Sequence, residues 1–378
     1  MRSKKLSRRC STVTAVALSA VLLPLSAAHA ADTSPTTVNR ATTDAFGRAA
    51  DAVFTDRTAA LLDGNQATRT ALKPTGGIPL SAALTRTENT AVSSLRGTRS
   101  RLAALGEAYT AADTQVTVNR TRVKGKRATA WVTETTTLTY EKIRGDEPDT
   151  TGFRAHHVLT FTAQPDGTWK LSGERSTDKG PRQVNEPVTG TTPRKTTMAA
   201  VDAPRAATTY PAPANPKTLT GSTYDYAAMA TYAEKYWKNY NTAYRKFNSV
   251  GGDCTNYLSQ SLNAGGWKQV SSSSEEYGTW SYGTSTQTDT WVGVNEWSWF
   301  TQTAKRTTAL ANVYQMDVGD VMQMDFDKDG SKDHSMITSY RSSSGVPYLT
   351  YHDTDTYRRS VSSILASYPT SAYYAYRT

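Results

Sequence analysis

Cysteine is scarce in this sequence, with two residues in a chain of 378. Cys10 lies in an N-terminal stretch that we expect to be removed, which leaves Cys254 as the one cysteine of the mature chain. A single cysteine cannot form an internal disulfide, so the class of small secreted proteins held together by disulfides is excluded. A lone thiol outside the cell is a buried inert residue, an intermolecular link or a reactive group.

Long apolar runs are missing after the N-terminus, so we expect no membrane span in the mature chain. Residues 1–30 have the pattern of a signal peptide: a basic start, a short apolar run over Val13–Leu25, and small residues around Ala30. Cleavage after Ala30 would give a secreted protein that is extracellular or associated with the cell wall.

A strong charge of one sign is absent from the mature chain. The formal charge of +10 falls to +5 with the signal peptide, which takes no acidic residue and these basic ones: Arg2, Lys4, Lys5, Arg8 and Arg9. We expect no dense basic stripe on the protein, and the sequence has no recognisable nucleic-acid-binding motif, so we expect no nucleic-acid partner. Much of the remaining excess lies before residue 220, and a mildly basic exported protein is attracted to an anionic cell wall.

Residues 31–176 predict a small α+β domain. Apolar residues recur at helical spacing over 38–62 and again over 84–105. Four stretches then have the composition of strands: 115–123, 127–143, 153–163 and 168–174. Helices followed by an antiparallel meander resemble the nuclear-transport-factor-like superfamily, which implies a cone-shaped fold. His156 and His157 lie next to each other on one strand and face opposite sides, so we expect ordinary surface and half-buried roles for them.

Residues 177–220 are rich in proline and threonine, which predicts an extended, semi-rigid linker. A second domain, 221–378, follows it. Its first helix is predicted over Tyr226–Phe247, with an aromatic stripe that belongs to the core. Three strands are predicted further on: Asp320–Phe326, His334–Tyr340 and Pro347–His352.

The surroundings of Cys254 distinguish it from an inert thiol. Asp253 is a good N-cap and Gly265 a good C-terminal cap, so Cys254 falls in the first turn of a short helix. Free amides and the helix dipole at that end favour the thiolate. The neighbouring carboxylate of Asp253 opposes this effect, and a base is therefore needed.

Two histidines of the second domain are candidates for that base. His334 and His352 each stand at an end of a predicted strand, and the short loop 341–346 joins the two strands. Antiparallel pairing would bring these ends together. One imidazole could then polarise the thiol of Cys254 while the other orients the first, as in papain-like enzymes.

Several segments resemble the bacterial family known as the putative amidase domain. They are Asp253–Gln260 (DCTNYLSQ), 264–267 (AGGW) and 333–335 (DHS), and the resemblance covers roughly 222–378. The order of elements is also similar to that of NlpC-type and CHAP cell-wall peptidases. The resemblance implies a papain-like cysteine hydrolase with Cys254 as nucleophile, His334 as base and His352 as orienting residue. The Gly251-Gly252 pair before the motif departs from the pattern, so the backbone amide of Cys254 is left as the expected oxyanion donor.

We therefore expect an amidase or peptidase that hydrolyses amide bonds of peptidoglycan or other cell-wall peptides. The rival from another class is a secreted wall-binding module that keeps the fold without catalysis. Two further alternatives are a structural cysteine and a zinc or copper site formed by Cys254, His334 and His352. The helix-start position and the motif favour catalysis.

An acidic loop and a set of tryptophans add two minor hypotheses. Asp325, Asp327 and Asp329 open a calcium-loop pattern, but Met336 stands where the closing glutamate is expected. We expect a plain turn and no required cofactor, with calcium as the alternative. Four tryptophans are expected to be mostly buried rather than to line a groove: Trp280, Trp291, Trp297 and Trp299.

Overall fold

The computed structural model describes residues 38–62, 77–188, 202–219 and 222–378. The expected signal peptide and the middle of the expected linker lie outside the described residues. Within these ranges, no helix combines the length and apolar character needed to cross a bilayer. All described residues fall in a single compact unit, 35–378.

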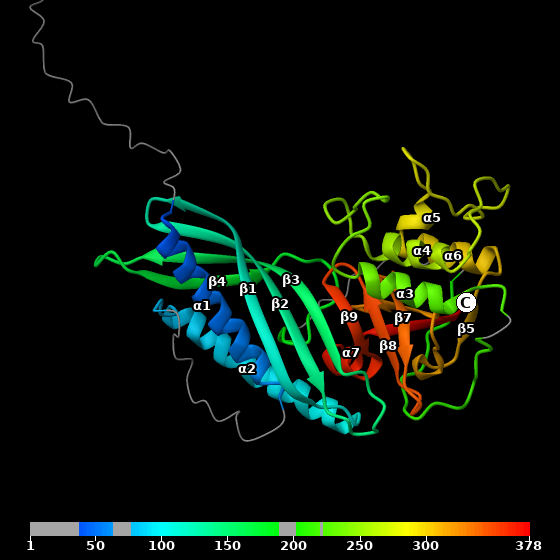
Figure 1. Ribbon diagram of the computed structural model, residues 1–378, viewed down its shortest axis with the longest axis horizontal. Coiled ribbons are helices and arrows are strands. Elements are labelled where there is room, and N and C mark those ends of the chain that lie inside the picture. The colour runs from blue at the N-terminus through cyan, green and yellow to red at the C-terminus, as the bar shows by residue number, and fades with distance from the viewer. Residues whose placement is uncertain (1–37, 63–76, 189–201, 220–221) are drawn as a thin grey trace, which may run out of the picture. The chain divides into compact units, whose positions relative to one another are not determined.

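The N-terminal half consists of two helices followed by a four-stranded antiparallel meander (Figure 1), as predicted. Its elements are α1 (Arg40–Ala59), α2 (Ala82–Ala104), β1 (Tyr109–Lys124), β2 (Arg127–Tyr140), β3 (Thr150–Ala163) and β4 (Trp169–Ser176). Asn39 caps α1 by accepting the backbone N–H of Thr42 at 2.8 Å. Phe46 of α1 stacks on Phe161 of β3 with ring centroids 3.8 Å apart, so the helices cover one face of this sheet.

The C-terminal half adds helices, a 3-10 turn and six strands. They are α3 (Tyr226–Tyr236), α4 (Cys254–Ala264), α5 (Asp289–Val292), α6 (Val294–Thr303), β5 (Thr308–Leu310), a 3-10 helix (Val313–Gln315), β6 (Val321–Asp325), β7 (His334–Arg341), β8 (Pro347–Tyr351), β9 (Asp355–Ser360), α7 (Val361–Ser367) and β10 (Ala372–Arg377). The strands predicted as β6, β7 and β8 are confirmed. The pairing of β7 with β8 is antiparallel, with Ile337 opposite Thr350, so the prediction that places His334 and His352 at the same end is also confirmed.

One sheet runs through both halves in the order β1-β2-β3-β9-β8-β7-β6-β10-β5, with β4 on β3. The junction is the antiparallel pairing of β3 with β9, in which Arg154 lies opposite Asp355. The chain is therefore α+β with a largely antiparallel sheet. The limits 31–176, 177–220 and 221–378 stay predictions. Asn185, inside the expected linker, is nonetheless buried and donates to Glu134 at 2.8 Å.

The helix predicted over Tyr226–Phe247 is wrong beyond Tyr236, where α3 ends. Asn241 forms a local turn instead, because its side chain accepts the backbone N–H of Ala243 at 3.0 Å. The hydroxyl of Tyr240 donates to Asp355 at 2.8 Å, which draws this segment toward the sheet. Beyond Tyr236, Tyr240 therefore contacts the sheet instead of continuing the helix.

Two apolar clusters cover opposite faces of the C-terminal part of the sheet. On one face, Ile337 of β7 packs with Leu258 of α4 and with three fully buried tryptophans, Trp280, Trp291 and Trp297. On the other face, Met336 packs with residues of β6, β8 and α7. The predicted burial of these three tryptophans is confirmed, and they line no open groove.

Candidate active site

Cys254 is the first residue of α4, and its side chain is 5% exposed. Asp253 occupies the N-cap position, as predicted, but its carboxylate does not cap the helix. Its Oδ1 accepts instead from the backbone N–H of Phe247 at 2.9 Å and from Nδ2 of Asn256 at 3.0 Å. The free helix amides must therefore find another acceptor.

That acceptor is Asp353, which sequence reasoning missed. Its Oδ2 accepts the backbone N–H groups of both Asp253 and Cys254, the latter at 3.0 Å, and its Oδ1 accepts from Nδ2 of Asn248 at 2.9 Å. The amide expected to serve as oxyanion donor is thus already occupied by a carboxylate of the same chain. The one available signal was an acidic residue directly after His352, at the end of a strand.

The contact with Asp353 gives a physical reason for Gly252, the second residue of the Gly251-Gly252 pair. Gly252 has φ +136°, and a Cβ built on it would lie 2.5 Å from Oδ2 of Asp353. Any side chain at Gly252 would therefore collide with the carboxylate that caps α4. Asp353 and Thr354 themselves have φ of +57° and +72°, so two consecutive residues with side chains take the left-handed conformation.

The environment of the sulfur disfavours the thiolate. Burial and the negative charge of Asp353 raise the pKa of Cys254 to about 12, although the backbone amide of Ser335 and the hydroxyl of Thr255 oppose that shift. The Thr255 hydroxyl lies 3.7 Å from Sγ. The expectation of a thiolate stabilised by the helix end is wrong for this conformation, because Asp353 takes the place of the anion.

His352 is held on all sides. Its Nδ1 lies 2.7 Å from Oδ2 of Asp253 and its Nε2 lies 2.9 Å from the carbonyl oxygen of Tyr236. The ring is stacked between Tyr240 and Tyr257, each at 3.9 Å. Both partners are acceptors, so the ring donates twice. Burial lowers the pKa of His352, but the hydrogen bonds to Asp253 and Tyr236 and the charges of Asp355 and Asp253 together outweigh burial, so the pKa is raised overall.

His334 is the second buried imidazole, with 1% exposure and an Nε2 that has no hydrogen-bond partner. Burial and then the charge of His352 lower the pKa of His334 to about 3, so the ring is neutral. The next residue, Ser335, faces α4 through a 3.0 Å contact with Thr255. Side chains alternate along a strand, so the ring of His334 is turned to the other side, against Tyr351 at 5.1 Å.

The described residues therefore bring the predicted site together only in part. Asp253, the residue before Cys254, contacts His352. The backbone amide of Ser335, the residue after His334, interacts with the sulfur of Cys254. Among the described side chains, no hydrogen bond joins either imidazole to Sγ of Cys254. Within the described residues, Cys254, His334 and His352 do not form a group that could hold a metal ion. Their catalytic roles stay predictions.

Comparison with known proteins covers the C-terminal segment that contains these residues. Residues 223–376 match the model of the family described as Putative amidase domain. This C-terminal segment is similar to that family. The uncharacterized protein YhbB of Bacillus subtilis (strain 168) is 27% identical over 153 residues, which are 36% of this chain and 48% of YhbB. The chain thus spans about half the length of that curated relative. No solved structure gives a significant match.

A polar pocket of about 450 Å³ adjoins the amidase domain at the β3–β9 junction. Asp353 and Thr354 form part of its wall, and Arg154 and His156 of β3 form another part. Lys238 and Lys246 complete the cationic lining, and no ion pair is found for either lysine among the described residues. The N-terminal half therefore contributes side chains to the space beside the capped helix end.

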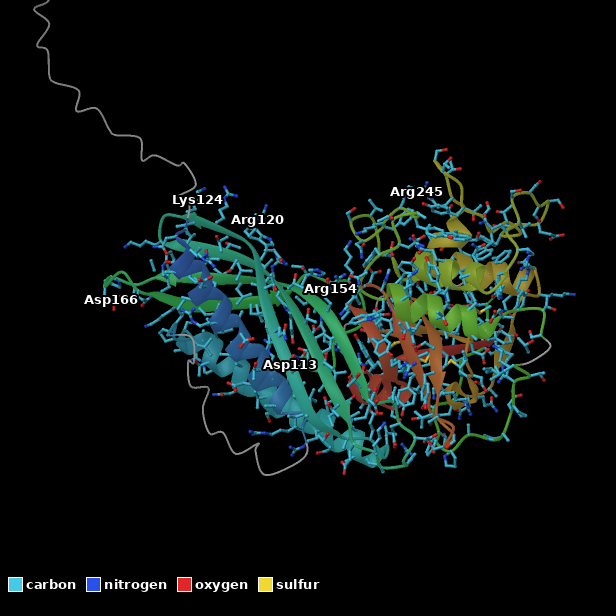
Figure 2. The ribbon with its side chains drawn as sticks, viewed as in Figure 1. Asp113, Arg120, Lys124, Arg154, Asp166 and Arg245 are labelled. Carbon is cyan, nitrogen blue, oxygen red and sulfur yellow. The ribbon has the colours of Figure 1, made fainter. Side chains whose placement is uncertain are left out.

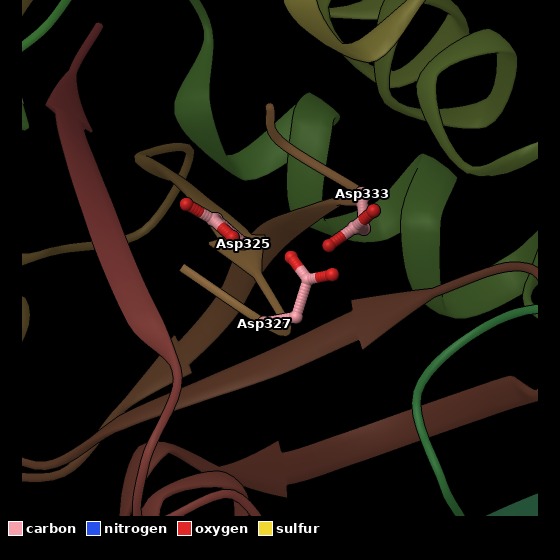
Figure 3. Close-up of side chains that lie close together, drawn as sticks. All are labelled: Asp325, Asp327 and Asp333. Atoms are coloured by element: carbon pink, nitrogen blue, oxygen red, sulfur yellow. The ribbon is translucent and has the colours of Figure 1, made fainter. Parts of the chain in front are cut away.

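The acidic loop of the amidase domain gathers three carboxylates (Figure 3). Asp325, Asp327 and Asp333 each offer an oxygen within 4.8 Å of the others. Asp329, named in the predicted calcium set, is not in this group, and its backbone N–H donates to Asp325 at 3.1 Å. Burial and the neighbouring aspartates raise the pKa of Asp333 to about 6. Oxygen ligands suit calcium, and calcium binding stays a prediction.

Proposed function

We propose that the protein is an exported cysteine-dependent amide hydrolase of papain-like design that acts on cell-wall peptides. The observation that carries the proposal is the position of Cys254 at the first residue of α4, inside a segment of the amidase family. Helix-end amides beside a thiol are the arrangement that acyl transfer uses to hold an oxyanion. Export and the cell-wall substrate rest on the sequence pattern alone.

His334 is the better candidate for the base. Its ring is neutral and keeps a nitrogen without a partner, so it can accept a proton. Both ring nitrogens of His352 are already used, and this residue instead fixes the carboxylate of Asp253. We propose that His334, as the first residue of β7, turns at the strand end toward the sulfur, while His352 positions the helix end.

Catalysis in this scheme requires Asp353 to leave the amides of Asp253 and Cys254. The amides are then free to bind the carbonyl oxygen of the substrate as it becomes an oxyanion. Sγ attacks the carbonyl carbon while His334 takes the thiol proton. The same proton goes to the leaving amine as the C–N bond breaks, and water then hydrolyses the thioester. The pocket beside Asp353 is where the substrate approaches.

Digestion of purified cell walls tests the proposal. The wild type, Cys254→Ala and Cys254→Ser are incubated with peptidoglycan, and released fragments are identified by mass spectrometry. New amine termini should appear with the wild type alone. His334→Gln should abolish turnover, and His352→Gln should lower it and destabilise the fold, because Asp253 loses its partner.

Equal release by the wild type and both Cys254 variants would refute the hydrolase. Retained wall binding without any release in a sedimentation assay would then favour the wall-binding module. Labelling with iodoacetamide is a second test. If wall fragments make the thiol of Cys254 accessible, iodoacetamide should label it faster in their presence than in their absence.

A further inference from the structure

The outer face of the N-terminal sheet gathers basic side chains from three strands. Residues Ala128, Ala130 and Val132 of β2 pack against α1 and α2, so the alternate residues of β2 point away from the helices. The strand register places their neighbours on the same outer side. We call this set the basic face: Arg120, Arg122, Lys124, Arg127, Lys170 and Arg175.

The basic face lacks compensating charge. None of its six residues makes an ion pair within the described ranges, and Lys124 lies directly opposite Arg127 across the β1–β2 pair. Like charges directly opposite each other on a sheet destabilise it. The acidic residues Glu134 and Glu174 of the same strands point inward, where they contact His157, and the exposed Asp113 lies toward the other end of β1. Such a gathering costs stability and is typical of a surface that binds a polyanion.

Figure 2 shows how this surface is arranged. Arg120 and Lys124 lie toward one end of β1, while Arg154 lies further along the sheet, toward β9. Arg154 also lines the pocket beside Asp353. Cations on alternate residues of β1 are about 7 Å apart, because a strand rises ~3.4 Å per residue. A flexible chain with one negative charge per repeat can follow this row.

The chemistry of the face favours a hydroxyl-bearing polymer over a nucleic acid. Its aromatic residue on β2, Trp131, is covered by the guanidinium of Arg120 at 3.8 Å from the ring centroid. Sheets that bind single-stranded nucleic acid instead offer open aromatic rings on which bases stack. Threonine hydroxyls such as those of Thr129 and Thr160 alternate with the cations and can bond polyol hydroxyls.

We propose that the basic face binds a linear anionic polymer of polyol or sugar phosphates. Such a polymer would hold the enzyme beside its substrate, with the chain running toward the pocket at Arg154. Four of these six charges lie close together in the sequence, within 120–127, and the sheet register adds Lys170 and Arg175 of β4 to the same face. Binding at this face does not depend on hydrolysis at Cys254, so the two proposals fail separately.

Binding of fluorescent poly(glycerol phosphate) to the mature chain tests this inference, measured by anisotropy over a series of salt concentrations. The variant Arg120→Gln/Arg122→Gln/Lys124→Gln should bind at least about tenfold more weakly at low salt, and the slope of log affinity against log salt should shrink by roughly 2. Lys170→Gln/Arg175→Gln is the second variant, should the first be unstable. The control variant loses three positive charges outside the basic face, Arg86→Gln/Lys268→Gln/Lys305→Gln, and should bind the polymer as tightly as the wild type.

Three results would overturn the inference. The wild type would show no salt-sensitive binding, or the control variant would weaken as much as the β1 variant, which would make net charge the cause. Equal or tighter binding of poly(dT) with the same number of phosphates would assign the face to nucleic acid. Uncharged dextran should not bind.

Discussion

The buried imidazole of His157 should make the stability of the protein fall as the pH rises above neutrality. The ring lies 2.9 Å from Glu174 and 3.2 Å from Glu134, with an exposed side-chain fraction of 3%. Burial lowers the pKa of His157, but the contacts with these two carboxylates and their negative charges together outweigh burial and raise it from 6.5 to about 9. The folded state therefore binds the proton more tightly than the unfolded chain does.

The size of the effect follows from the shift. Each pKa unit corresponds to about 1.4 kcal/mol, so the charged ring contributes roughly 3 kcal/mol to the free energy of unfolding. This contribution is complete below pH 6.5 and is lost as the pH rises through about 9. His157→Gln leaves Glu134 without a cation and should cost a similar amount at neutral pH and little in strongly alkaline buffer.

Urea unfolding of the wild type, His157→Gln and His156→Gln over a series of pH values gives the measurement. His156 is the matched control, because the same substitution falls on the next residue, whose side chain is 45% exposed beside Asp178. Its loss should cost well under about 1 kcal/mol. Parallel decline of the wild type and His157→Gln between neutral pH and pH 9 would refute the reasoning.

Three further changes test the site and the acidic loop. Asp353→Asn removes the charge that raises the pKa of Cys254 and should speed iodoacetamide alkylation by about tenfold for each pKa unit regained; Asp355→Asn is the control and should leave the rate unchanged. Gly252→Ala should lower the free energy of unfolding by about 1–3 kcal/mol, and with it the melting temperature. It should also speed alkylation, because the new Cβ displaces Asp353. Asp333→Asn, measured with EDTA, should raise the melting temperature at pH 7.5 and not at pH 4, because a carboxyl with a raised pKa costs stability only when ionised.

The sequence predicted the parts of the fold whose signal is local. The helical period of α1, the alternation along β2 and the short loop between β7 and β8 depend on neighbouring residues and were all confirmed. Strand β9 was missed, because Asp355–Ser360 is short and polar and gains its place by pairing with β3. The half-buried position expected for His157 is wrong for the same reason: the side chain is buried, and its partners come from other strands.

The candidate site shows the same division. Placement of Cys254 at a helix start follows from Asp253 and Gly265 nearby in the sequence. The cap of that helix comes from Asp353, which is 99 residues further along the chain. No local sequence pattern predicts such a contact. The Gly251-Gly252 pair is visible in the sequence as a departure from the family pattern, but the reason for glycine at 252 requires the position of Asp353 in space.

The two pKa values at the site show that the described conformation is a resting state of any such hydrolase. Transfer of a proton from a thiol of pKa about 12 to an imidazole of pKa about 3 is uphill by roughly 12 kcal/mol. One turnover per second allows a total barrier of about 17 kcal/mol, which leaves too little for attack on an amide. Release of Asp353 lowers the thiol pKa, and entry of the polar substrate ends the burial that lowers the pKa of His334. Both changes act in the direction that proton transfer needs. Asp353→Asn should therefore raise thiol reactivity even without substrate, and an unchanged alkylation rate would mean that Asp353 does not control the nucleophile.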